Sequence, residues 1–271
     1  MPYEPPRGFR ASLRAGEPKF GLLALSGSPQ LVEMGGFLGM DFVLLDMEHS
    51  DGVGPAEVLH LIRAADAARI PALVRVTRNQ PDVIQRVLDY GAAGICVPHV
   101  SSAAEAAQAV AHAKYPPSGS RSTCPHIRAG SYGGRGDVAA YTADANRETV
   151  VMVLVEDPAG VAALEEIVAV PGLDVIGIGL SDLARGLGLE GDARSPELDW
   201  ARRRSAELAR QHGLAASAHL TTSLARDAGF RSSELAALRE EGFSMFSWQD
   251  TSVFKEAVVE LLAPCRAAVK R

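Results

Sequence analysis

Acidic, basic and imidazole side chains follow short apolar runs at several places in this sequence. The run that ends L-L-D-M-E-H-S places Asp46, Glu48 and His49 together, and L-V-R-V places Arg75 inside the next run. A carboxylate beside an imidazole is typical of acid–base chemistry, because the carboxylate can orient the ring. A cation inside an apolar run must meet a carboxylate or an anionic ligand. These residues predict a site that transfers protons and binds an anion.

Two further apolar runs end in carboxylates. V-L-V-E-D contains Glu156, and I-G-L-S-D-L contains Ser181 and Asp182. Hard divalent cations such as Mg²⁺ prefer carboxylate oxygens and keep several water ligands. Glu156 and Asp182 therefore form a candidate open metal site with two carboxylates.

Each of these residues also has a purely structural interpretation. His49 could end a strand through a hydrogen bond, and Arg75 could form an internal salt bridge with Glu48 or Glu156. Glu156 and Asp182 could each cap a following helix. The remaining histidines carry a weaker signal. His99 follows the fourth strand and could face the mouth, but we interpret it as a structural histidine. We interpret most of the others as surface residues: His60, His112, His126, His212 and His219.

Composition excludes several classes of function. The chain has 271 residues and a net charge of −6, which does not favour binding to nucleic acid or to an anionic membrane. No apolar run reaches the roughly 18 residues of a membrane span, and the first residues lack the apolar core of a signal peptide. The three cysteines never occur as C-x-x-C. We expect a reduced, cytoplasmic protein without a disulfide framework.

The candidate site residues follow regularly spaced apolar runs, which must position them in the fold. Each run is followed by a stretch of helical length, which predicts parallel strands joined by right-handed crossovers. Eight runs suit a (β/α)₈ TIM barrel, whose active site lies at the C-terminal ends of the strands. We predict one barrel domain over residues 1–271 with strands at 20–25, 42–45, 72–76, 94–97, 150–155, 175–178, 214–217 and 243–246.

Two segments fall outside this regular alternation. Residues at about 115–149 form a long irregular stretch that opens Y-P-P-S-G-S-R-S, and a loop of this length in a compact domain is usually functional. A final helix is expected at about 252–270. It would either close the barrel or pack on a neighbouring subunit.

The order and spacing of five motifs resemble those of the class II, metal-dependent pyruvate aldolases. The motifs are D-x-E-H, V-R-V, K-Y-P-P-S-G-S-R, V-x-V-E-D and I-G-x-S-D-L, and the resemblance is clear over about residues 19–190. This family includes 4-hydroxy-2-oxoheptanedioate aldolase and 2-dehydro-3-deoxyglucarate aldolase. The resemblance implies a barrel like the phosphoenolpyruvate/pyruvate domain, and a small-molecule 2-oxo acid and an aldehyde as partners.

The resemblance also implies roles for individual residues. Glu156 and Asp182 would hold Mg²⁺, Mn²⁺ or Co²⁺, which acts as a Lewis acid. Arg75 would stabilise the enolate that forms when the C3–C4 bond of a 4-hydroxy-2-oxo acid breaks. His49, oriented by Asp46, would be the base that takes the 4-hydroxyl proton.

Further implied roles concern the surroundings of the metal and the subunit contacts. Glu48 would hold metal-bound waters, and the backbone N–H groups of Ser181 and Asp182 would bind the substrate carboxylate. The last helix would be exchanged between subunits of a homo-oligomer, a trimer or a hexamer. The long loop would reach an adjacent active site, where Arg128 would contact the acceptor.

The expected function is therefore reversible cleavage of a 4-hydroxy-2-oxo acid to pyruvate and an aldehyde. Two departures from the family pattern, Leu154 and Leu180, lie near the expected donor site. They leave open a second lyase activity at the same site, such as oxaloacetate decarboxylation or a reaction on a CoA ester. They also leave open a non-catalytic barrel that binds an oxo acid.

Overall fold

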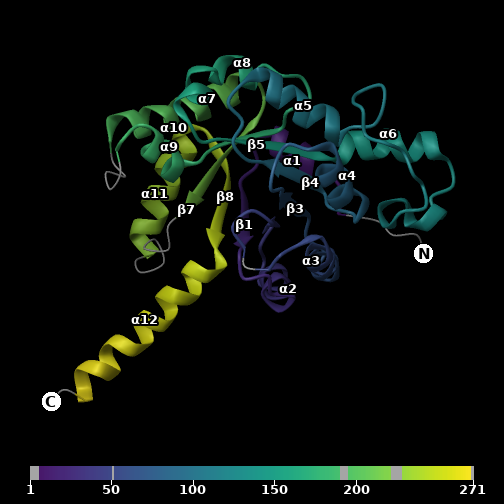
Figure 1. The fold of residues 1–271 in the computed structure, drawn as a ribbon. Coiled ribbons are helices and arrows are strands. Elements are labelled where there is room, and N and C mark those ends of the chain that lie inside the picture. The colour runs from purple at the N-terminus through teal and green to yellow at the C-terminus, as the bar shows by residue number, and fades with distance from the viewer. Residues whose placement is uncertain (1–5, 51, 190–194, 221–227, 270–271) are drawn as a thin grey trace.

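Eight parallel strands close into a barrel in chain order (Figure 1). The computed structural model describes residues 6–50, 52–189, 195–220 and 228–269. The predicted (β/α)₈ barrel is confirmed. The strands are β1 (Lys19–Ala24), β2 (Phe42–Asp46), β3 (Ala72–Arg75), β4 (Gly94–Val97), β5 (Val150–Val155), β6 (Val175–Ile178), β7 (Ala215–Leu220) and β8 (Phe243–Gln249).

Helices follow the strands and cover the outside of the barrel, as Figure 1 shows. Several of them begin at a proline, which suits the first turn because that turn needs no N–H donor. The helices are α1 (Phe9–Arg14), α2 (Pro29–Phe37), α3 (Pro55–Ala67), α4 (Pro81–Asp89), α5 (Ala103–Ala113), the 3₁₀ helix η1 (Arg128–Gly133), α6 (Val138–Glu148), α7 (Pro158–Ala162), α8 (Leu164–Val168), α9 (Leu180–Gly186), α10 (Pro196–Gln211), α11 (Ala228–Glu241) and α12 (Asp250–Val269).

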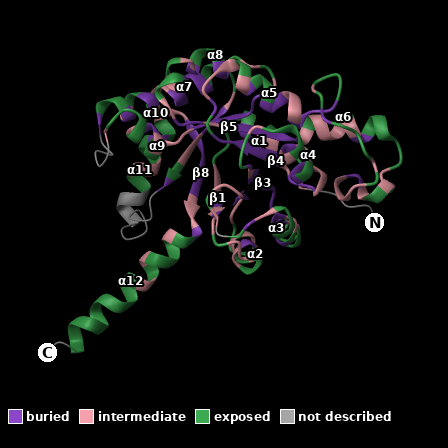
Figure 2. Ribbon diagram, in the orientation of Figure 1, coloured by how far each residue is buried: buried purple, intermediate pink, exposed green. Residues whose placement is uncertain are grey.

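Alternate strand residues fill the barrel interior, and the others pack against the helices. The interior cluster includes Leu44, Leu73, Cys96 and Met245, and the strands are buried along most of their length (Figure 2). Because side chains of a strand alternate between its two faces, the polar residues two positions after Leu44, Leu73 and Met245 also face inward, and these are Asp46, Arg75 and Ser247. They therefore form the next layer toward the C-terminal mouth of the barrel.

The first helix closes the opposite, N-terminal end of the barrel. Phe9 and Leu13 of α1 belong to the interior cluster. Arg10 Nε and Arg14 Nε each lie 2.8 Å from Oδ1 of Asp174, which is fully buried just before β6. Asp174 also accepts the backbone N–H of Val151 at 3.0 Å. One carboxylate thus ties α1 to two strands.

The segment at 115–149 is more ordered than its sequence suggests, because it contains η1 and α6. The side chain of Asn146 on α6 accepts the backbone N–H of Tyr115 at 2.7 Å and donates to its carbonyl at 2.9 Å. The hydroxyl groups of Tyr115 and Tyr141 are 3.1 Å apart. Tyr141 is the one buried residue of α6, so this helix has no apolar stripe that a sequence pattern could reveal.

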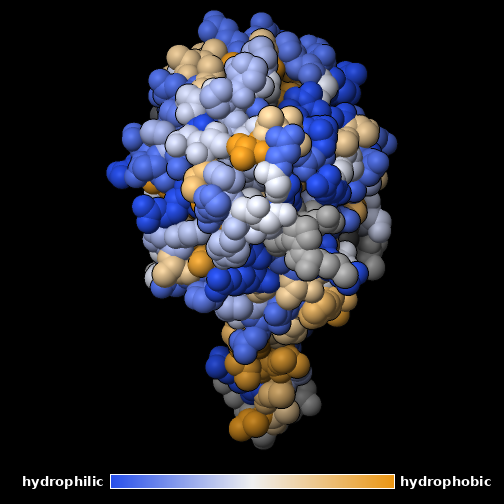
Figure 3. Space-filling model, turned by 90° about the vertical axis from the view of Figure 1, so that its right-hand side faces the viewer, coloured by the Kyte–Doolittle hydropathy of each residue, from blue (hydrophilic) through white to orange (hydrophobic). Residues whose placement is uncertain are grey.

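The last helix, α12, points away from the barrel (Figure 1). Its start is fixed by Asp250, whose carboxylate accepts the backbone N–H groups of Leu25 and Ser26 at 3.0 and 3.1 Å. Most of the remaining helix is exposed, and Figure 3 shows apolar residues gathered on the protruding part. Among the described residues, no helix combines the length and the apolar character that a membrane crossing requires.

Candidate active site

A continuous set of polar contacts runs around the C-terminal mouth of the barrel, across the ends of β2, β3, β4 and β5. We call it the mouth cluster, and its members are Asp46, Glu48, Arg75, His99 and Glu156. The chain order of the four strands is also their order in the barrel. Consecutive strand ends therefore bring side chains that are more than 100 residues apart in the sequence into one site.

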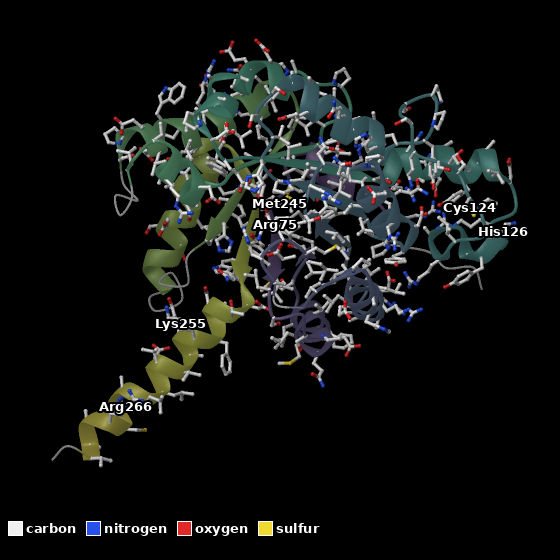
Figure 4. The ribbon with its side chains drawn as sticks, in the orientation of Figure 1. Arg75, Cys124, His126, Met245, Lys255 and Arg266 are labelled. Carbon is white, nitrogen blue, oxygen red and sulfur yellow. The ribbon has the colours of Figure 1, made fainter. Side chains whose placement is uncertain are left out.

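Asp46 holds Arg75 in a two-pronged ion pair. Its Oδ1 accepts Nε of Arg75 at 2.8 Å, and its Oδ2 accepts Nη2 at 2.6 Å. The carboxylate is fully buried and also accepts the backbone N–H groups of Glu48 and His49 at 3.0 and 3.3 Å. Asp46 thus orients the guanidinium and the loop backbone, whereas we expected it to orient the ring of His49. Figure 4 labels Arg75 within the barrel.

Glu48 links Arg75 to the histidines. Its Oε2 lies 3.3 Å from Nη1 of Arg75 and 3.7 Å from Nε2 of His49, and its Oε1 lies 2.8 Å from Nε2 of His99. Oε2 is buried, yet it accepts no hydrogen bond with good geometry. A buried carboxylate oxygen without a donor is costly unless a cation compensates it. The His49 side chain is 57% exposed, so its ring can meet a ligand at the mouth.

His99 belongs to this cluster, although the sequence predicted only a structural role for it. It follows β4 and has φ 55°, a left-handed conformation that is uncommon for a residue other than glycine. Its backbone N–H donates to Oε2 of Glu156 at 2.9 Å, and its ring Nδ1 lies 3.0 Å from the same oxygen. The available sequence signal was position: His99 follows an apolar run, as the other site residues do.

Glu156 is nearly buried at the end of β5. Burial raises its pKa, the hydrogen bond from His99 opposes this, and the negative charge of Glu48 raises it further. Its other oxygen, Oε1, faces Gly179, the residue before α9. A Cβ atom at position 179 would lie 2.4 Å from Oε1, so glycine is required there for the carboxylate to occupy this position.

Asp182 and Ser181 lie in the first turn of α9, next to Glu156 in the order of the strand ends. The Asp182 side chain is 43% exposed, and its nearest cation is Nη1 of Arg185 at 3.6 Å. It makes no ion pair with the mouth cluster. Within the described ranges, no group of three or more His, Cys, Asp or Glu side chains is arranged so that it could hold a metal ion by itself. Glu156 and Asp182 would therefore need ligands from water or substrate.

The two leucines that depart from the family pattern differ in environment. Leu154 packs against the interior cluster at the level below Glu156. Leu180 begins α9 and is partly exposed. Neither offers a polar contact to a substrate.

His219 faces the mouth from β7 and is exposed, as expected of a surface residue, while its ring is partly enclosed by its neighbours. It is two strand positions from Ser217 and pairs in register with Ser247 of β8. Its Nδ1 lies 3.3 Å from the Ser247 hydroxyl. Burial lowers the pKa of His219, and the positive charge of Arg75 lowers it further. His60, His126 and His212 are exposed, as predicted.

Arg128 lies near the C-terminal ends of α3 and α4, on the side of the barrel opposite the mouth. Its Nη2 is 2.5 Å from Asp66 near the end of α3, and its Nη1 donates to the carbonyl of Tyr90 after α4 at 2.8 Å. Helices run antiparallel to the strands, so their C-terminal ends lie at the N-terminal end of the barrel. Arg128 is therefore distant from the mouth of its own subunit, and its expected role in a neighbouring site stays a prediction.

Comparisons with known proteins agree with this architecture. Residues 19–249 match the family model for HpcH/HpaI aldolase/citrate lyase. A hydroxypyruvate/pyruvate aldolase of Sagittula stellata is 39% identical over 72% of this chain and 75% of its own length. A 5-keto-4-deoxy-D-glucarate aldolase of Klebsiella pneumoniae is 36% identical over 77% of this chain and 80% of its own.

Comparison with solved structures points to the same family. The crystal structure of an HpcH/HpaI aldolase/citrate lyase family protein from Burkholderia cenocepacia superposes with a TM-score of 0.85 at 31% identity. The superposition covers 96% of this chain and 99% of the other.

Proposed function

Because the chain belongs to the HpcH/HpaI aldolase/citrate lyase family, we propose that it reversibly cleaves a 4-hydroxy-2-oxo acid to pyruvate and an aldehyde in a metal-dependent reaction. Family membership confirms the resemblance to class II pyruvate aldolases and the expected enzyme class, a carbon–carbon lyase. The observation that carries the proposal is the mouth cluster together with His49, because they gather a fixed guanidinium, an accessible imidazole and buried carboxylates at one barrel mouth.

The charge of this site fits a divalent cation. Asp46 and Glu48 share one permanent cation, Arg75, while Glu156 adds a further buried carboxylate and a buried oxygen of Glu48 lacks a hydrogen-bond donor. Asp182 lies near Arg185 instead. Glu156 and Asp182 would hold Mg²⁺, Mn²⁺ or Co²⁺. When bound, the metal would supply a Lewis acid for the keto oxygen of a 2-oxo acid.

Arg75 would stabilise negative charge that develops on the substrate. The ion pair with Asp46 holds its guanidinium in one orientation, and its side chain is only 12% exposed. A donor fixed in advance in a partly dry site stabilises developing charge without reorganising during the reaction. The N–H groups at the start of α9, at Ser181 and Asp182, would bind the substrate carboxylate.

His49 would act as the base. Its backbone is fixed by Asp46 and its ring is accessible, so the imidazole can take the 4-hydroxyl proton directly or through a water molecule. In the direction of synthesis, the same ring returns that proton to the new alkoxide.

Incubating metal-loaded protein with pyruvate and a panel of aldehydes, and measuring carbon–carbon bond formation, tests this proposal. Glu156→Ala and Asp182→Ala should each abolish carbon–carbon bond formation, whereas Glu166→Ala, which changes an exposed carboxylate on α8, should not. Unchanged turnover in both site variants would refute the metal assignment. Oxaloacetate is assayed in parallel, because a decarboxylase that uses the same site is the second candidate.

We also propose that the enzyme is a homo-oligomer joined through α12. This helix leaves the barrel and exposes Phe254, Leu261 and Val269, of which each side chain is more than two-thirds exposed. Apolar surface of this extent on a protruding helix indicates a protein contact. A trimer or hexamer would also bring the segment that contains Arg128 close to another subunit's mouth.

A further inference from the structure

The two oxygens of Glu156 have different surroundings. Oε2 accepts the backbone N–H of His99 at 2.9 Å and lies 3.0 Å from Nδ1 of the same residue. Oε1 accepts no hydrogen bond from any described residue and lies against Gly179, on the side where α9 begins. One oxygen is therefore engaged twice, and the other stays available.

His99 makes this arrangement through an unusual backbone conformation. With φ at 55°, its N–H and its ring point to the same carboxylate oxygen. The ring is held from its other side by Oε1 of Glu48, 2.8 Å from Nε2. Strained conformations of this kind persist where the surrounding contacts require them, and they are concentrated at functional sites.

Gly179 provides the second restraint. Its N–H donates to the carbonyl of Val155 at 2.9 Å, so the backbone here is fixed against β5. A Cβ atom at this position would lie within 2.4 Å of Oε1 and 2.6 Å of Cγ of Glu156. The carboxylate occupies space that only a glycine leaves open.

We propose that His99 is a positioning residue that turns Glu156 so that Oε1 is presented to a divalent cation beside α9. The inference rests on the proposed function, in which Glu156 and Asp182 hold the metal. His99 takes up Oε2 and leaves the ligand oxygen on the Asp182 side of the mouth. Residues that orient a metal ligand typically contribute about 10- to 100-fold to metal affinity.

Mn²⁺ titration of the full-length protein by calorimetry, without substrate, tests the proposal. His99→Phe removes the ring contacts, and it should raise the Kd for Mn²⁺ by about 10- to 100-fold. His219→Phe is the matched control, because His219 lies at the same mouth and does not contact Glu156, and its Kd should stay within about 2-fold of wild type. Gly179→Ala should weaken binding as His99→Phe does.

A conservative variant separates positioning from general damage. Asparagine tolerates the left-handed backbone and keeps one side-chain donor, so His99→Asn should recover part of the lost affinity. The Co²⁺ absorption spectrum of the saturated His99→Asn protein should match that of wild type. A spectrum that shows loss of a nitrogen ligand would make His99 a ligand and overturn the positioning role.

Glu156→Ala separates a failure of the metal assignment from a failure of the role proposed for His99. If Glu156→Ala binds Mn²⁺ as wild type does, the metal assignment in the proposed function fails. If Glu156→Ala loses binding while His99→Phe binds with unchanged Kd, only the role of His99 fails.

Discussion

At the scale of the residue, the orientation of Arg75 depends on one buried carboxylate, that of Asp46. The guanidinium is held by two hydrogen bonds to Asp46 and by a longer contact to Glu48. Asp46 is fully buried, so it fixes the charge of Arg75 without being exposed at the mouth itself. Its role is to position Arg75 and the loop after β2.

Asp46→Asn should lower kcat/KM by about 100-fold in the aldol assay, because Arg75 loses its charged partner while the side-chain volume is kept. Steady-state kinetics with metal at saturation measures the change. Asp144→Asn is the control, since Asp144 forms ion pairs on α6. Equal kinetics for Asp46→Asn and wild type would contradict the role given to Asp46.

Lys114 provides a pH-dependent contribution to stability outside the site. Its ammonium is buried and donates to the carbonyls of Asn146 and Thr149 at 2.8 and 2.5 Å. Burial, together with the positive charge of Arg10, lowers the pKa of Lys114 to about 7. The unfolded chain, with its ordinary value of 10.5, then binds more protons than the folded chain between these two values.

Stability should therefore rise with pH through this window, by up to about 1.4 kcal/mol per pH unit from this group. Urea unfolding at pH 6.5, 7.5 and 8.5 measures it. In Lys114→Met, the free energy of unfolding should lack this rise with pH that wild type shows. Parallel pH profiles for the two proteins would show that Lys114 does not titrate in this range.

At the scale of the element, one acidic residue, Asp174, accepts both ion pairs that join α1 to the barrel, beside the packing of Phe9 and Leu13. Asp174 receives Arg10 and Arg14 from α1 and a backbone N–H from β5. The two arginine side chains are 18% and 39% exposed, so their charges keep partial access to water if the carboxylate is lost.

Asp174→Asn should lower the free energy of unfolding by about 2 kcal/mol, less than for a fully buried pair because of that access. Urea denaturation measures the loss. Glu165→Gln, which removes an exposed partner of Arg204, should change stability by no more than about 0.5 kcal/mol. A comparable loss in both variants would argue against the special role of Asp174.

Elements differ in how well their sequences reveal them. Strand β5 has a continuous apolar run and agrees with its prediction at 150–155. The strands β7 and β8 extend beyond the predicted 214–217 and 243–246, because polar residues such as His219 and Ser247 face the mouth. Hydrophobic patterns therefore fail where a strand enters the site.

At the scale of the whole molecule, α12 is the element through which we propose that the subunits assemble. The helix has 20 residues, begins at Asp250 and points away from the barrel (Figure 1). Its main contacts are with β1 and β8. Lys255 and Arg266 lie along this helix (Figure 4).

Phe254→Glu combined with Leu261→Glu should convert the oligomer to smaller species, because two charges would enter the proposed apolar contact. Light scattering coupled to size exclusion measures the mass. Lys255→Glu, on the same helix, should keep the wild-type mass. A monomeric wild-type protein would refute assembly through α12.

The sequence by itself determined the barrel, the approximate strand positions and the carboxylates at the strand ends, because burial on both faces requires apolar runs and parallel strands require crossovers. It could not determine which partners these residues have. Arg75 could have paired with Glu48 or Glu156, and the tertiary structure pairs it chiefly with Asp46.

Only the tertiary structure showed that His99 joins Glu48 to Glu156, because this contact depends on one left-handed backbone conformation and on residues from three different strand ends. The direction of α12 was also undetermined by its sequence, since an apolar helix can cover its own barrel or another. Local patterns specify which residues are buried. Contacts between distant segments depend on the register and closure of the whole barrel.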